Sequence, residues 1–358
     1  MSSIDIFKNY YKEEKEELTK VINDYNKEFI IEDNSIIQEN LDYFQNLNSD
    51  GKLVRGTLVD LGYYLLKNDK SYSRNLALAY EVFQTAILVH DDIIDKDEIR
   101  RGKETIHNKN YKKYNEYSND KEELTNLSNS IGICMGDYGL YSANKIISES
   151  YFNDLNLGRV LNCFNTTVLN TIKGELLDVI LPFQSKHMNI DNKLLEDSIM
   201  NIYRLKTSHY TIIGPLSVGL ILAGSDDKKL DDIEKFGEKV GIAFQIQDDI
   251  LGIYSNEMGK VIGSDIKEFK QTILYSHIMT TEYKDKLEKY YGNDNLNEEI
   301  VEEVKNIFKE SGSLEYATNK MNEMYDESIN ILNSINWINE DKKEILRGFV
   351  EYLRTRNK

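Results

Sequence analysis

The stretch LVHDDIIDKDEIRRG, residues 88–102, places three aspartates and then two arginines directly after the apolar run FQTAILV, residues 83–89. That run has the composition of a buried helix, and burying unpaired carboxylates beside it is costly. On a helix, Asp91 and Asp95 lie one turn apart on one face, with Asp92 adjacent. Carboxylates this close repel one another unless a positive charge lies between them. The stretch therefore predicts a helix end that binds a hard divalent cation, of which magnesium fits best.

The composition fits a helical protein with a large core. The chain has 358 residues, 40% of them hydrophobic, and two prolines. Apolar residues recur at the period of a helix face from Ile6 to Leu353, and most segments are rich in helix formers. A β-sandwich would need far more frequent turn signals. We therefore expect an all-α protein with roughly a dozen helices in a single domain, residues 1–358.

The charge and the cysteines exclude several classes of protein. A formal net charge of −17 disfavours nucleic acid and anionic membranes as partners. The first residues lack the apolar stretch of a secretory signal, and no segment reaches the ~18 consecutive apolar residues of a membrane span. We therefore expect a cytoplasmic protein without stable membrane insertion. Cys134 and Cys163 are isolated, which argues against a zinc site or a disulfide framework.

Two polar stretches, residues 108–126 and 224–235, are expected to be connections between helices. Apolar helical segments continue on both sides of each, so neither is expected to separate domains. One such segment, residues 210–224, is almost wholly apolar and could supply a surface for self-association.

A second aspartate pair closes another apolar helical stretch. In AFQIQDDILG, residues 243–252, Asp248 and Asp249 follow residues that should be buried. Two further pairs, at 226–227 and 231–232, lie in polar surroundings, where a solvated helix end explains them. The apolar context distinguishes the functional candidates from these pairs.

Positively charged residues complete the pattern. Taken singly, each is more simply explained as a surface charge, but together with two acidic patches they predict a pocket for two polyanions. One polyanion would be held through magnesium and the other directly by guanidinium and ammonium groups. The candidate cations are Lys52, Arg55, Arg100, Arg101, Lys206, Lys260 and Lys270.

At this point the motifs resemble those of the trans-isoprenyl diphosphate synthases, or polyprenyl synthetases, and among them most closely the geranylgeranyl diphosphate synthases. GKLVRG at 51–56 is similar to the family's GKxxRG motif, and DDIID at 91–95 followed by RRG at 100–102 is similar to its first aspartate-rich motif. Lys206-Thr207 resembles the KT step, and FQIQDD at 244–249 resembles the second aspartate-rich motif.

The resemblance implies the isoprenoid synthase fold, in which antiparallel helices surround a central cavity and the two aspartate groups face each other across its mouth. It also implies a homodimer with magnesium as cofactor. The implied substrates are isopentenyl diphosphate and an allylic diphosphate, such as dimethylallyl, geranyl or farnesyl diphosphate, which a prenyltransferase joins head to tail.

The matching positions carry the family's roles as expectations. The expected metal ligands are Asp91, Asp92, Asp95, Asp178, Asp248 and Asp249. The residues expected to contact the allylic diphosphate are Arg100, Lys206 and Lys260. Those expected to hold isopentenyl diphosphate are Lys52, Arg55, Gln84 and Arg101, with Lys270 as a further substrate-binding candidate. Thr207 and Gln245, with the backbone near Lys206, are expected to face the developing allylic cation.

The chemistry follows from the placement of charge. Loss of diphosphate leaves an allylic carbocation, and cations stabilise the departing anion in the transition state. The double bond of isopentenyl diphosphate then attacks, and the released diphosphate is the expected proton acceptor. His90 is an alternative base, but a packing role explains it better.

Product length is expected to depend on the residues just before the first motif. Farnesyl-producing relatives often carry aromatic residues at the positions of Ala86 and Ile87, so the small Ala86 favours a longer product. Tight packing against a neighbouring helix is an equally good reading of Ala86 without the family context. Gly252 stands where a third aspartate of the second motif would lie, as in several geranylgeranyl diphosphate synthases. Geranylgeranyl diphosphate is therefore the expected product, with farnesyl or longer diphosphates as alternatives. A terpene cyclase and a non-catalytic modulating subunit fit the motifs less well.

Overall fold

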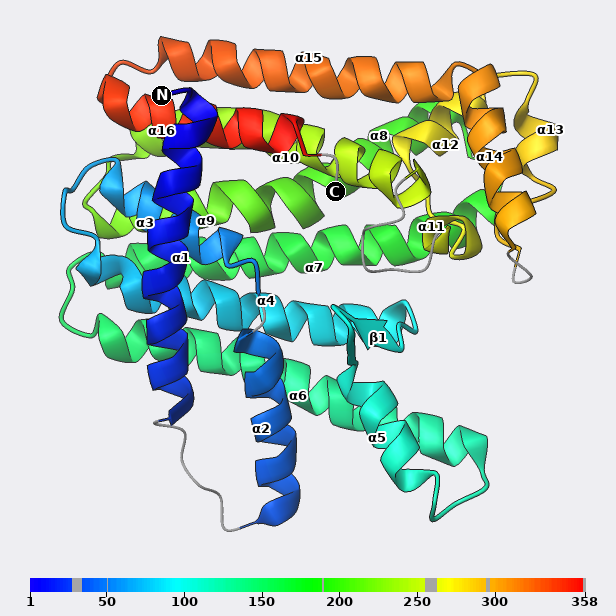
Figure 1. Ribbon diagram of the computed structural model, residues 1–358, viewed down its shortest axis with the longest axis horizontal. Helices are drawn as coiled ribbons and strands as arrows, with labels where there is room; N and C mark the ends of the chain where they lie inside the picture. Colours follow the sequence, from blue (N-terminus) through cyan, green and yellow to red (C-terminus); the bar gives the residue numbers. More distant parts are fainter. Residues whose placement is uncertain (28–33, 50, 189, 255–262, 294–296, 357–358) are drawn as a thin grey trace. The chain divides into compact units, whose positions relative to one another are not determined.

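The computed structural model describes residues 1–27, 34–49, 51–188, 190–254, 263–293 and 297–356 (Figure 1). Almost all regular structure in these ranges is helical, apart from one pair of two-residue strands. The prediction of an all-α protein is therefore confirmed. The chain divides into two compact units, which are described separately. The second-motif unit comprises Met1–Asn9, Cys163–Ser217 and Asp226–Lys358, and the first-motif unit comprises Tyr10–Asn162 and Val218–Ser225.

The first-motif unit is built around helix α4. Its elements are most of α1 (Ser3–Lys27), α2 (Ser35–Ser49), α3 (Val54–Tyr64), the 3-10 turn η1 (Ser71–Ser73), α4 (Arg74–Ile94), β1 (Ile99–Arg100), β2 (Lys103–Glu104), α5 (Ile106–Tyr114) and α6 (Lys121–Ser150). Helix α4 packs along α6 and α3 (Figure 1). Because it is apolar on most faces, its residues are buried almost without interruption from Leu76 to Ala86.

A buried ionic cluster ties three helices of this unit together. The Arg74 guanidinium of α4 pairs with Glu14 of α1 and Asp60 of α3, and Ser73 also donates to Asp60. Lys70 pairs with Glu14 from the other side. Burial raises the pKa of Asp60 to about 7, although Arg74 acts in the opposite direction. The cluster therefore contains a carboxyl group that titrates near neutral pH.

The second-motif unit is built around helix α10. Its elements are most of α7 (Leu157–His187), α8 (Asn192–Ile202), the π-helix η2 (Tyr203–Ile213), α10 (Asp227–Tyr254), α11 (Ser264–Lys267), α12 (Ile273–Ile278), α13 (Lys284–Leu287), α14 (Glu298–Glu310), α15 (Ser313–Ser334) and α16 (Glu340–Arg354). Helix α9 (Gly214–Leu222) is shared between the two sets of residues. Helix α10 contacts α15 and η2.

The prediction of a connection over residues 108–126 was wrong for most of that stretch, because α5 continues to Tyr114 and α6 begins at Lys121. Asparagine side chains find partners here: Asn108 Nδ2 donates to the Glu98 carbonyl at 3.1 Å. At the start of α6 the carboxylate of Asp120 accepts backbone N–H groups, which satisfies donors that a helix leaves unpaired. The second predicted connection, 224–235, is also shorter than expected, because α10 starts at Asp227.

The suggestion that residues 210–224 supply a surface for self-association was also wrong. Except for Gly224, every residue of this segment is buried. A helix that is apolar on all faces belongs in a core. In the described ranges, no helix is both long enough and apolar enough to span a bilayer.

Candidate active site

The first aspartate motif forms the end of helix α4. Asp91 and Asp92 belong to its last turn, and Asp95 follows its last residue. Arg100 of β1 reaches back to this turn. Its Nη2 donates to Asp91 Oδ2 at 3.1 Å and to Asp97 Oδ2 at 3.0 Å, and its Nε donates to Asp92 Oδ1. One guanidinium therefore holds two of the three predicted carboxylates, Asp91 and Asp92, together with Asp97, which was not predicted.

Burial of this motif favours a positive charge beside its carboxyl groups. Asp92 is 3% exposed, and burial raises its pKa to about 7 although Arg100 lowers it. Asp91 and Asp95 are half-buried. Each further positive charge near such a carboxyl group stabilises its ionised form. The end of α4 is thus suited to binding a cation.

A tight hairpin positions the two arginines differently. Strands β1 and β2 pair antiparallel, with Arg100 opposite Lys103. The connecting residues Arg101 and Gly102 have φ values of 54° and 76°. Positive φ at both central positions is the geometry of a type I′ turn, which glycine favours. As a result, Arg100 turns toward the aspartates whereas Arg101 is exposed at the tip.

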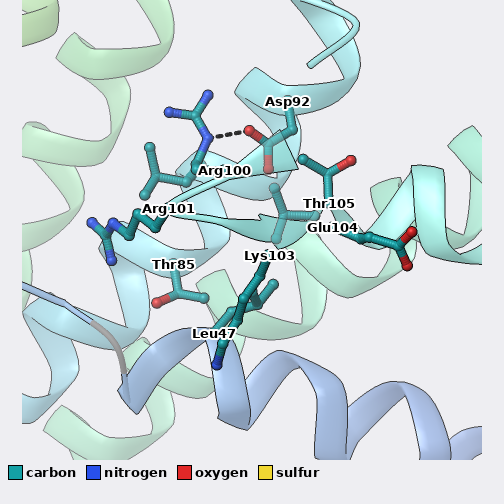
Figure 2. Close-up of a pocket in the computed structure, with 10 residues that line it drawn as sticks. Leu47, Thr85, Asp92, Arg100, Arg101, Lys103, Glu104 and Thr105 are labelled. Carbon is teal, nitrogen blue, oxygen red and sulfur yellow. Dashed lines mark hydrogen bonds and ion pairs between the residues drawn. The ribbon is translucent and has the colours of Figure 1, made fainter. Parts of the chain in front are cut away.

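A pocket of the first-motif unit lies between α2, the end of α4 and this hairpin (Figure 2). Part of its wall is apolar and part is cationic. The apolar residues are Leu47, Leu88 and Val89, and the cationic ones are Arg100, Arg101 and Lys103. Asp92 also lines it, and the dashed line in Figure 2 joins Asp92 to Arg100. Glu104 lines it as well, so the wall combines apolar, cationic and anionic side chains. Its volume of about 30 Å³ is room for one or two water molecules.

The GKLVRG segment leads into helix α3. Lys52 is exposed, and its carbonyl accepts the hydroxyl of Tyr11. Leu53 has a φ of 56° and provides no side-chain cap for the helix. Arg55, in the first turn of α3, is half-buried. The predicted cations of this segment therefore lie at the N-terminal end of α3.

Glu81 of α4 caps that helix end from outside. It is 2% exposed, and its Oε1 accepts the N–H of Gly56 at 2.7 Å. Burial raises the pKa of Glu81, whereas Gly56 and the nearby guanidinium groups of Arg55 and Arg101 lower it. Gln84, a predicted substrate contact, is buried one turn further along α4. Glu81 thus links the two cationic motifs of the first-motif unit.

The second motif is buried in a chain of hydrogen bonds. Asp249 is 1% exposed and accepts hydrogen bonds from the hydroxyl of Tyr203 and from Gln245 Nε2, the latter at 2.9 Å. The hydroxyl of Thr207 donates to Gln245 Oε1 at 2.6 Å. Burial raises the pKa of Asp249 to about 7. The structure therefore connects Thr207, Gln245 and Asp249 by hydrogen bonds.

Three predicted residues of the second-motif unit form ion pairs: Lys206, Asp178 and Asp248. Lys206 Nζ lies 2.7 Å from Asp178 Oδ2 and 2.7 Å from Glu175 Oε2. Asp248 Oδ1 lies 3.2 Å from Arg356 Nη1, near the end of the chain. Two predicted metal ligands, Asp178 and Asp248, are thus each within an ion pair.

The π-helix η2 presents Lys206 and Thr207, and two glycines allow it to lie close to its neighbours. A Cβ atom on Gly174 of α7 would lie 2.5 Å from the backbone nitrogen of Lys206. A Cβ atom on Gly241 of α10 would lie 2.4 Å from Cα of Ser208. No side chain fits at either position. The wide helical turns of η2 thus lie close to α7 and α10 at Lys206 and Ser208.

The gap left by Gly252 is occupied by another carboxylate. A Cβ atom on Gly252 would lie 2.6 Å from Oδ2 of Asp265, a residue of α11 that is 5% exposed. Lys270 Nζ lies 3.8 Å from the other oxygen of Asp265. The predicted diphosphate ligand Lys260 lies outside the described residues.

The proposed product-length positions differ in their surroundings. Ala86 is fully buried, whereas Ile87 is half-buried. His90 packs over Gly136 of α6, and its Nε2 lies 3.2 Å from the Ile133 carbonyl oxygen. This contact agrees with a packing role for His90.

The donor set suits magnesium only in combination with a substrate. Within the described residues, no group of three or more His, Cys, Asp or Glu side chains is gathered so that it could hold a metal ion by itself. Magnesium usually uses one or two carboxylates and completes its shell with water and phosphate oxygens. In the first-motif unit, Asp91 and Asp92 offer hard oxygen donors, and burial raises the pKa of Asp92. In the second-motif unit, Asp249 offers carboxylate oxygens, and burial raises its pKa as well. Taken singly, each motif has donors that suit magnesium bound together with a diphosphate.

Several contact residues were missed from the sequence. Glu81 could have been noticed, because it is an acidic residue inside the apolar run of α4. Asp265 could have been sought, because Gly252 replaces the third aspartate of the second motif and leaves a carboxylate missing there. Arg356 and Tyr203 gave no local signal, because their partners are distant in the sequence.

The chain is similar to known enzymes over most of its length. It is 27% identical over 359 residues to a geranylgeranyl diphosphate synthase of Sulfolobus acidocaldarius, with 98% of this chain and 99% of that protein covered. It is 28% identical over 276 residues to a short chain isoprenyl diphosphate synthase of Methanocaldococcus jannaschii, with 76% of each covered.

Solved structures have the same fold. The crystal structure of geranylgeranyl pyrophosphate synthase from Corynebacterium glutamicum, complexed with isoprenyl diphosphate and magnesium, matches with a TM-score of 0.85. The match covers 98% of this chain and 99% of that chain at 23% identity. The predicted isoprenoid synthase fold is therefore confirmed. A sequence model of the polyprenyl synthetase family matches residues 34–308, which is more than half of the sequence, and the chain thus belongs to this family of prenyltransferases.

Proposed function

We propose that the chain condenses isopentenyl diphosphate head to tail with an allylic diphosphate, and that geranylgeranyl diphosphate is the main product. The observation that carries this proposal is the carboxylate–guanidinium group of Asp91, Asp92 and Arg100 beside a pocket with an apolar wall and further cations, Arg101 and Lys103. The identity to geranylgeranyl diphosphate synthases of Sulfolobus acidocaldarius and Saccharolobus solfataricus supports this product.

In this proposal both aspartate motifs act on the allylic diphosphate, and residues 1–358 work as one catalytic domain. The family match at 34–308 includes residues of both compact units, which supports this view. Magnesium would neutralise the diphosphate oxygens as the carbon–oxygen bond breaks. Its proposed ligands are Asp91, Asp92, Asp95, Asp178, Asp248 and Asp249.

The cations of the chain stabilise the departing diphosphate. Arg100 and Lys206 have carboxylate partners, so each could exchange a carboxylate oxygen for a diphosphate oxygen where bound magnesium would compensate the charge of the released carboxylate. Lys260 is proposed to act with them. The dipoles of Thr207 and Gln245, fixed by their mutual hydrogen bond, stabilise the developing allylic cation.

The second substrate is held by the cationic motifs of the first-motif unit. Lys52, Arg55, Arg101 and Gln84 bind isopentenyl diphosphate, with Lys270 as a further cation. Its double bond then attacks the allylic carbon, and the proton lost from the condensed product goes to the released diphosphate.

The test is a condensation assay with labelled isopentenyl diphosphate and each allylic primer, with magnesium and with excess chelator. We expect geranylgeranyl diphosphate with magnesium and no product with chelator. Cyclic hydrocarbons formed without isopentenyl diphosphate would indicate a terpene cyclase instead. No turnover alone, but activation of another prenyltransferase, would indicate a modulating subunit.

We also propose a homodimer. Helix α7 exposes apolar side chains at a spacing of three and four residues, which forms one stripe along the helix. These are Leu169, Ile172, Leu176, Val179 and Phe183. Sedimentation velocity should give a dimer for the wild type and a monomer for Leu176→Asp; a wild-type monomer would refute the proposal.

A further inference from the structure

Ala86 lies at a tight contact between three helices of the first-motif unit. A Cβ atom on Gly139 of α6 would lie 2.8 Å from the Ala86 Cβ of α4 and 2.5 Å from Cζ of Phe44, which belongs to α2. Phe44 is 4% exposed, and its ring meets that of Tyr138 edge to face, with centroids 6.3 Å apart. The space that the two small residues leave between α4 and α6 is therefore filled by an aromatic ring from α2.

Helix α2 is fixed to α4 close to this ring. The hydroxyl of Thr85 donates to Asn48 Oδ1 at 2.9 Å, and both residues are buried. The hydroxyl of Tyr43 donates to the Glu104 carbonyl of β2 at 2.7 Å. The position of the Phe44 ring is therefore set by hydrogen bonds on both sides of it in the sequence.

The same face of α2 also lines the pocket beside the first motif. Leu47, three residues after Phe44 and so on the same side of the helix, forms its wall together with Leu88 and Val89. Ala86 lies six residues before Asp92, about 9 Å along the axis of α4. Phe44 does not itself line the pocket; it lies one turn before Leu47 on α2, next to Ala86, which precedes the lining residues Leu88 and Val89 on α4.

We propose that Phe44 determines the length of the prenyl product. This inference rests on the proposed function, in which a diphosphate is bound at Asp91, Asp92 and Arg100 and its hydrocarbon chain extends along apolar residues. A growing chain that follows the wall from Leu47 meets the Phe44 ring at the level of Ala86. The small Ala86 alone does not open this space, because the ring of another helix occupies it.

The assignment predicts that the ring can be exchanged between helices. Phe44→Ala removes it and leaves a space bounded by Ala86 and Gly139. Ala86→Phe adds a second ring where atoms already lie in contact, so this variant alone is overpacked. The double variant moves one ring from α2 to α4 and keeps the total volume.

The experiment measures the distribution of products from farnesyl diphosphate and excess labelled isopentenyl diphosphate, using the full-length chain. For Phe44→Ala we expect the ratio of products longer than geranylgeranyl diphosphate to geranylgeranyl diphosphate to rise about tenfold or more. The double variant should return the ratio to the wild-type value or below it. Leu41→Ala, a buried residue one turn earlier on α2, is the matched control and should leave the ratio unchanged.

The outcomes separate this inference from the proposed function. If the wild type condenses nothing, the proposed function fails and the inference falls with it. If Phe44→Ala condenses isopentenyl diphosphate but gives the wild-type ratio, only the inference is overturned. An equal shift in Leu41→Ala would show general loosening of α2 and would also overturn it. Should Phe44→Ala not fold, Phe44→Leu is read by the same criterion, with a smaller expected rise.

Discussion

The cap that Glu81 provides for helix α3 can be tested by two substitutions with opposed expectations. Glu81→Ala leaves the N–H of Gly56 buried without an acceptor, which costs about 1–3 kcal/mol, and removes a buried methylene, worth about 0.8 kcal/mol. Removing the buried charge returns about 1 kcal/mol, as for the glutamine variant below, so the expected loss in free energy of unfolding is about 1–3 kcal/mol. Glu81→Gln keeps an acceptor of the same shape.

For Glu81→Gln two terms nearly cancel. A hydrogen bond to a neutral acceptor is weaker than one to a carboxylate by about 1 kcal/mol. Against this, the raised pKa of Glu81 shows that burial penalises its charge, and the amide avoids that penalty. We expect the stability of this variant at pH 7 to lie within about 1 kcal/mol of the wild type.

Urea unfolding measures both variants, and the transition midpoint at an unchanged slope reports the change. The pKa of Glu81 is higher in the folded than in the unfolded state. Its contribution to stability is therefore fully present below the unfolded-state pKa and is lost as the pH rises through the folded-state pKa. The glutamine variant should lack this pH dependence. In activity assays, Glu81→Ala should raise KM for isopentenyl diphosphate more than for the allylic primer, since the cap fixes the first turn of α3 that carries Arg55. An alanine variant as stable as the wild type, or a glutamine variant as unstable as the alanine one, would refute the capping argument.

Three further predictions concern the motifs and the core. Asp91→Ala should lower turnover by about 100- to 1000-fold without altering the circular dichroism spectrum, and near-normal turnover would mean that the metal site is misplaced. Because the pKa of Asp60 is raised from 3.8 to about 7, the free energy of unfolding should fall by at most about 4 kcal/mol as the pH rises between these values. Urea unfolding of Asp60→Asn should show a weaker dependence of stability on pH. The same pH dependence in both proteins would contradict the raised pKa of Asp60. Gly252→Ala gains about 1 kcal/mol of helix propensity but presses on Asp265 at a cost of about 1–3 kcal/mol. It should therefore destabilise the wild-type protein and stabilise the Asp265→Ala variant. Additive effects in the double-mutant cycle would show that the two residues do not touch.

The sequence was most informative for helix α4, which contains both buried core residues and the first aspartate motif. The apolar run before Asp91 predicted α4, and the motif spacing predicted the family. The failed prediction at residues 108–126 has a physical reason. Polar residues of helix α5 have hydrogen-bond partners outside it: Asn108 donates to the Glu98 carbonyl and Asn110 donates to the side chain of Asn40 on α2. Local propensity does not contain that information.

The candidate site was predictable as a list of residue types, but not as a set of contacts. That Arg100 holds Asp91, Asp92 and Asp97 together depends on the I′ turn that follows it. The ion pair of Asp248 with Arg356 joins residues more than a hundred positions apart. The role of Ala86 could not be decided from its size, because the ring that contacts it comes from α2.

The wide turns of η2 bear on how insertions and deletions can occur in this chain. A π-helix closes its hydrogen bonds over one residue more than an α-helix. Removing a single residue between Tyr203 and Ile213 could therefore be absorbed by a return to α-helical winding, with the rest of the unit left folded. The helical segments before and after η2 would then keep their facing, whereas residues inside η2, Lys206 among them, would move around the helix axis. Such a deletion is therefore expected to leave the protein folded but to remove the ion pair between Lys206 and Asp178.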